Sequence, residues 1–161
     1  MTRLIESMSV KVPSQHSEFL DELIGRAPFS KQKAPFVHFY DALVFAATLG
    51  FQSGRREPLA KGKGKDPIEY STMSKNKYFN ALLASFAVLN SKDDHKCLSG
   101  DSAASRIELF EQYACAGLTI LKENRESCQS NFRIFVETST IQRLASLALE
   151  LESEMSNPDL M

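Results

Sequence analysis

Residues 36–49 read FVHFYDALVFAATL, and this stretch decides the fold. Its apolar residues cover almost every side of a helix rather than one stripe, which is typical of a helix buried all round. Pro35 stands directly before it and favours a helix start, because the fixed φ of proline suits the first turn. Gly50 follows it and is expected to end it. We therefore predict a central helix on which the other elements pack.

Helical spacing of apolar residues recurs on both sides of this stretch. Ser14 is expected to cap a short helix that Gly25 ends. Residues 68–72 alternate apolar and polar, so a short strand and the lead-in to a helix are both open. Further helices are predicted over residues 76–89, 103–122 and, as one helix or two, 132–155. The predicted fold is mainly all-α: one compact domain of five to six helices over residues 1–161, with a loop at 52–67 and a frayed end at 156–161.

Composition narrows the class of protein. The chain has 161 residues, 43% of them hydrophobic, which suits one domain with a real core. A net charge of -1 excludes a uniformly basic nucleic-acid coat and an acidic disordered tail. The longest apolar run, residues 42–47, is far shorter than the ~20 residues that a membrane span needs. Without an apolar signal-peptide core near the N-terminus, the cytoplasm is the expected location.

The near-neutral charge hides two segments of opposite sign. Residues 55–77 carry a net charge of +4, and residues 105–161 carry −4. The sequence GRREPLAKGKGKDP over residues 54–67 has no periodicity, so it predicts a long basic loop. Its ammonium groups could follow a phosphate backbone, face an acidic protein, or simply be solvated. The candidate binding residues are Arg55, Arg56, Lys61, Lys63, Lys65, Lys75 and Lys77.

Catalytic and metal-binding motifs are not recognisable. Three cysteines without a CxxC spacing give no disulfide framework and no zinc motif, and no cofactor is expected. His38 is predicted to bond Asp41 as a structural pair. Cys115 lies among small residues that favour close approach of another helix over a reactive thiol. A metal-dependent nuclease needs clustered carboxylates, and only the fold could gather the candidates, which are Asp41, Glu57, Asp66 and Glu69.

Three segments resemble a known family. They are FYDALVFAATLGF at residues 39–51, GRREPL at 54–59 and LFEQYACAGL at 109–118. Together they resemble the small bacterial proteins associated with DNA phosphorothioation (Dnd) systems. The resemblance implies a non-enzymatic accessory component of a bacterial DNA-modification and anti-phage defence system of the restriction-modification kind. Its implied partners are DNA, near Arg55 and Arg56, or other subunits of such a complex. A protein-interaction adaptor or oligomeric scaffold without DNA contact, and a small nuclease, are the alternatives.

Overall fold

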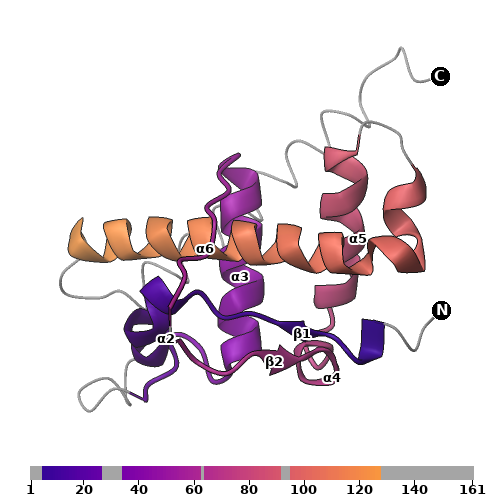
Figure 1. The fold of residues 1–161 in the computed structure, drawn as a ribbon. Helices are drawn as coiled ribbons and strands as arrows, with labels where there is room; N and C mark the ends of the chain where they lie inside the picture. Colours follow the sequence, from indigo (N-terminus) through magenta and orange to yellow (C-terminus); the bar gives the residue numbers. More distant parts are fainter. Residues whose placement is uncertain (1–4, 27–33, 63, 92–94, 128–161) are drawn as a thin grey trace, which may run out of the picture.

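The computed structural model describes residues 5–26, 34–62, 64–91 and 95–127, and this part of the chain is mainly helical, as predicted (Figure 1). Two short strands, β1 (Ser9–Val10) and β2 (Ile68–Glu69), pair antiparallel, with Ser9 opposite Glu69. The described residues also form three 3₁₀ turns: η1 (Ser14–His16) precedes α2, and η2 (His95–Leu98) and η3 (Gly100–Ser102) connect α5 to α6. The α-helices are α2 (Ser17–Leu23), α3 (Phe39–Gln52), α4 (Tyr70–Met73), α5 (Phe79–Asn90) and α6 (Ala103–Ser127).

Helix α3 is the predicted central helix, and α6 crosses it in backbone contact (Figure 1). A Cβ added to Gly117 would lie 1.7 Å from the Ala46 carbonyl oxygen. A Cβ added to Gly50 would lie 2.1 Å from the Tyr113 carbonyl oxygen. Only glycine fits at either position, since real Cβ atoms do not approach this closely. The small-residue patch around Cys115 therefore packs helix on helix, as predicted.

The predicted limits of α3 are wrong at both ends. The helix begins at Phe39 instead of residue 36, because the Phe36 amide donates to the Leu23 carbonyl and His38 remains extended. The helix ends at Gln52, and Gly50 lies inside it against α6. Gly54, with a φ of 64°, takes the left-handed conformation that the sequence assigned to Gly50.

Other element limits follow from local hydrogen bonds. Helix α5 begins at Phe79 because the Asn76 side chain accepts from the Tyr78 amide and holds residues 76–78 in a turn. Residues 68–72 combine both open alternatives, since β2 leads directly into α4. Gly25 follows the end of α2 with a φ of 75°, as predicted. Ser14 begins η1 instead of capping α2. The helices predicted over 132–155 and the frayed end at 156–161 lie outside the described residues.

The core lies where α3, α5 and α6 meet. Phe110 of α6 is fully buried, with its ring 5.1 Å from that of Phe79 in an edge-to-face arrangement. Phe86 lies in contact with both Phe51 and Tyr113, at centroid distances of 4.7 and 5.0 Å. Phe51, Phe79, Phe86 and Phe110 therefore all pack at this junction. No helix within the described ranges is long and apolar enough to cross a membrane.

Candidate functional site

The basic loop is bound to the body of the protein over much of its length. Residues 53–62 and 64–67 contain no helix or strand and lead from α3 to β2. The Glu57 amide donates to the Gln112 carbonyl of α6 at 3.1 Å. The side chain of Gln15 in η1 donates to the Pro58 carbonyl and accepts from the Ala60 amide. These bonds hold the first half of the loop against η1 and α6.

Two of the predicted binding residues form ion pairs within the protein. Arg55 lies 3.1 Å from Glu57 and 3.5 Å from Glu123 on α6. Lys65 lies 2.8 Å from Asp21 on α2, and its ammonium group is also 5.1 Å from the centre of the Phe39 ring. The charge of the basic loop is thus partly neutralised by acidic residues of α2, α6 and the loop itself.

The other predicted residues divide into three groups. Arg56, Lys61 and Lys75 are exposed and form no ion pair with any residue in the described ranges. Lys77 is exposed, with its ammonium group 4.9 Å from the centre of the Tyr78 ring. Lys63 lies outside the described residues. Lys75 and Lys77 follow α4, so the fold puts them on a separate segment from the loop.

A hollow of about 380 Å³ lies where the second half of the loop meets the end of α2. Phe39 is on its wall, with the Arg26 guanidinium 4.5 Å from the ring centre and the Lys65 ammonium at 5.1 Å. Cations over an aromatic face are held electrostatically by the ring. Neither Arg26 nor Phe39 belongs to the basic segment, so the composition of that segment does not identify them as candidate binding residues.

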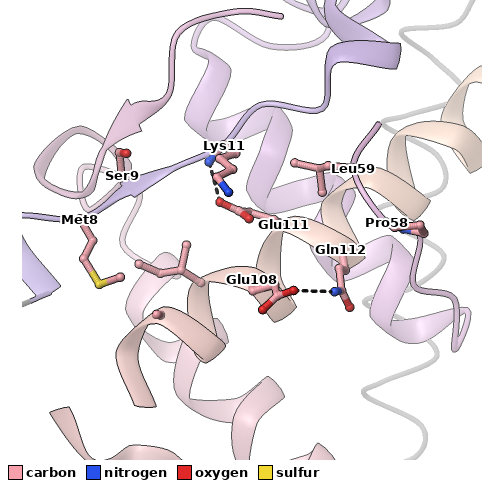
Figure 2. Close-up of a pocket in the computed structure, with 10 residues that line it drawn as sticks. Met8, Ser9, Lys11, Pro58, Leu59, Glu108, Glu111 and Gln112 are labelled. Atoms are coloured by element: carbon pink, nitrogen blue, oxygen red, sulfur yellow. Dashed lines mark hydrogen bonds between the residues drawn. The ribbon is translucent and has the colours of Figure 1, made fainter. Parts of the chain in front are cut away.

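A second hollow, of about 480 Å³, lies between β1, the loop and α6 (Figure 2). Glu111 lies on its wall and accepts from the Lys11 amide at 2.6 Å, while Gln112 donates to Glu108 at 3.4 Å. Burial raises the pKa of Glu111 above its ordinary range, and the Lys11 hydrogen bond opposes that shift. Both carboxylates of this hollow therefore already have partners from the chain.

A buried polar cluster lies under the loop. The Thr119 hydroxyl donates to Glu57 at 2.6 Å and lies 3.0 Å from Nε2 of His16. An imidazole nitrogen of His16, a carboxylate oxygen of Glu57 and the Cys115 sulfur all lie within 4.8 Å of one another. The cluster joins η1, the loop and α6. It is the group within the described residues that could hold a metal ion.

Protonation states within this cluster exclude an activated nucleophile. Burial, and then the negative charge of Glu57, raises the pKa of the Cys115 thiol to about 11. Burial, and then the Lys122 charge, lowers the pKa of His16. At neutral pH a protonated thiol faces a neutral imidazole, whereas a catalytic Cys–His pair needs a thiolate. The cluster could hold a metal ion, but its thiol is not activated as a nucleophile.

Two predicted side-chain arrangements are not the ones observed. Asp41 accepts from the Asn76 side chain at 2.9 Å, and His38 stacks on Tyr40 at 4.8 Å, in place of the predicted His38–Asp41 pair. Of the four nuclease carboxylates, Glu57 alone joins the potential metal-binding group found in the described part of the chain. The fold does not gather Asp41, Asp66 and Glu69 around it.

Comparison with known proteins identifies a family. A family model described as DNA sulphur modification system-associated protein 4 matches residues 9–148, which is most of the chain. The match includes η1, the basic loop and α6. No curated protein and no solved structure matches the chain.

Proposed function

The chain belongs to the family of DNA sulphur modification system-associated protein 4, and from this premise we propose that it is a non-enzymatic accessory component that contacts the DNA backbone. The family match confirms the resemblance seen in the sequence, and it associates the chain with a DNA sulphur modification system. The observation that carries the DNA contact is the set of cations along the loop. The loop supplies Arg56, Lys61 and Lys65, while Arg26 after α2 and Lys75 and Lys77 after α4 lie outside it.

The second half of the loop supports this proposal best. Lys61 is exposed without an ion pair among the described residues, and Lys65 and Arg26 lie together at the Phe39 ring. Phosphate groups attract such cations without regard to base sequence. Lys65 would exchange Asp21 for a phosphate, which costs little because surface ion pairs contribute about 0–1 kcal/mol.

A non-enzymatic role is the proposal that fits the side chains. The Cys115 thiol is protonated at neutral pH, and the carboxylates that a nuclease needs for Mg²⁺ are not gathered in the described ranges. Positioning DNA for other components of the system needs only the cations and a fastened loop. Those other components are the further partners that we propose.

The test is duplex binding measured by fluorescence anisotropy over a range of salt concentrations. Each lost phosphate contact lowers the slope of log K against log salt by about 0.9. We therefore expect the triple variant Arg26→Ala, Lys61→Ala and Lys65→Ala to lower the slope by up to about 2.7 units. Single variants should each contribute about one third of that change.

Arg125→Ala is the matched control. Arg125 pairs with Glu22 of α2 and lies 5.8 Å from the centre of the Phe19 ring, so its contacts are of the same two kinds as those of Lys65, but it belongs to α6. Its removal should leave the slope unchanged. If the folded wild-type protein fails to bind duplex DNA even at low salt, DNA contact is rejected. The loop would then face a protein component, as in the adaptor alternative.

A further inference from the structure

We propose that His16, Glu57 and Cys115 form a Zn²⁺ site that fastens the basic loop to η1 and α6. The three donor atoms lie within 4.8 Å of one another and come from three separate elements. This inference goes beyond DNA contact and does not depend on it, because the cluster lies beneath the loop and not among its exposed cations.

The donor set matches the chemistry of zinc. Imidazole nitrogen, thiolate sulfur and carboxylate oxygen are its usual ligands, at about 2.0–2.3 Å. Magnesium and calcium prefer all-oxygen sites, so a thiol and an imidazole favour zinc. Tetrahedral geometry puts donors roughly 3.3–3.8 Å apart at those bond lengths. The donor atoms lie within 4.8 Å of one another, so the longest separation must close by about 1 Å at most, and rotation of the Glu57 side chain can shorten the two separations that involve its carboxylate.

The His16 imidazole provides the independent observation. Its side chain is buried, with 6% exposed, and Nδ1 has no hydrogen-bond partner in the described residues. Its other nitrogen, Nε2, bonds the Thr119 hydroxyl. A metal-binding histidine usually gives its second nitrogen to a polar neighbour, and Nε2 beside Thr119 fits that role while Nδ1 keeps a free lone pair. An unpaired buried acceptor costs stability, and a metal ion would remove that cost.

Charge balance also favours a divalent cation. Zinc displaces the thiol proton, so the Cys115 sulfur becomes a thiolate and one proton passes to the solvent. Together the thiolate, the Glu57 carboxylate and the neutral imidazole carry two negative charges, which Zn²⁺ cancels, and Arg55 would then be released from Glu57 while it keeps Glu123 as a partner. The Glu57 side chain is 29% exposed, so an ion and a completing water have a route from solvent.

The experiment titrates chelator-treated full-length protein with Co²⁺, a spectroscopic probe for zinc sites, and with Zn²⁺ by calorimetry. We expect one ion per chain, a thiolate-to-cobalt charge-transfer band, and release of about one proton in buffers of different ionisation enthalpy. Cys115→Ser should remove the band, and His16→Gln and Glu57→Gln should weaken zinc binding at least tenfold. Cys97→Ser and His38→Gln are the matched controls, since both residues lie outside the cluster.

Limited trypsin digestion supplies a second readout. Zinc should slow cleavage after Lys61 in the wild type and in Cys97→Ser, but not in Glu57→Gln. Glu57→Gln can still accept the Thr119 hydrogen bond, so it keeps the assay meaningful if Cys115→Ser fails to fold. An unchanged band in Cys115→Ser, or no zinc binding by the wild type, overturns the proposal. Neither result alters the salt slope for DNA, so the two proposals fail separately.

Discussion

Replacing Gly117 by alanine tests the crossing on which the whole fold rests. The added Cβ would lie 1.7 Å from the Ala46 carbonyl oxygen, 2.4 Å from the carbonyl carbon and 2.8 Å from the Cα atom. All three atoms belong to the backbone of α3, so no side-chain rotation relieves the clash. The two helices must move apart, or one must bend.

The cost follows from that geometry. Ordinary contact with a Cβ begins near 3.4 Å, so the helices must separate by about 1.7 Å along that line. Even a gap of ~0.5–1 Å forfeits a quarter to a half of the dispersion energy of the facing atoms. Overpacking usually costs ~1–3 kcal/mol. Because backbone atoms block relief here, we expect Gly117→Ala to lower the free energy of unfolding by at least about 3 kcal/mol.

Urea denaturation followed by circular dichroism measures this change. The thermal midpoint should fall on the order of 10 °C for a chain of this size. Gly62→Ala is the matched control, because its added Cβ meets nothing closer than 3.8 Å. It should raise the free energy of unfolding by no more than about 1 kcal/mol. If Gly117→Ala unfolds at the same urea concentration as the wild type, the backbone contact between α3 and α6 is wrong.

Two further predictions concern the core and the hollow of Figure 2. Phe110→Ala should cost about 3–5 kcal/mol of unfolding free energy, because the ring is fully buried, whereas exposed Leu89→Ala should cost less than about 0.5. Burial raises the pKa of Glu111 above its ordinary 4.5. The protonated Glu111 side chain therefore stabilises the folded state at low pH, and this stabilisation is lost as pH rises through the folded pKa. Between about pH 4 and about pH 7, the free energy of unfolding measured with urea should therefore fall less in Glu111→Gln than in the wild type. If the two proteins give parallel curves of unfolding free energy against pH, the prediction is contradicted.

The helix pattern was largely readable from the sequence, and the misplaced end of α3 has its physical origin in the contact with α6. Apolar residues on most sides of 36–49 predicted a central helix, which the structure has at Phe39–Gln52, since this pattern depends on the helix alone. Gly50 was assigned to the end of that helix because glycine often stands there. Glycine also permits close approach of two backbones, and the facing residues Tyr113 and Gly117 decide between the roles. A local pattern does not contain that partner.

The candidate sites were less predictable for the same reason. The basic loop was found by its composition, which is a local property. The cluster of His16, Glu57 and Cys115 has no spacing motif, because its members lie on three elements that meet only in the folded chain. The odd number of cysteines argued against a zinc motif, but that rule applies to ligands close together in sequence. The rule does not cover a single cysteine whose fellow ligands are distant in the sequence.

The separation of charge along the chain has a different meaning once the fold is known. A basic segment of +4 and an acidic one of −4 suggest an external partner only if the fold keeps them apart. Arg55 instead reaches Glu123 on α6, and Lys65 reaches Asp21 on α2. Among the described residues, the predicted binding residues without an ion pair are Arg56, Lys61, Lys75 and Lys77. Screening by salt weakens exposed pairs first, so part of the salt dependence of any complex must come from these internal contacts. Arg55→Ala removes two internal pairs, those with Glu57 and Glu123, and so separates that part from the phosphate contacts.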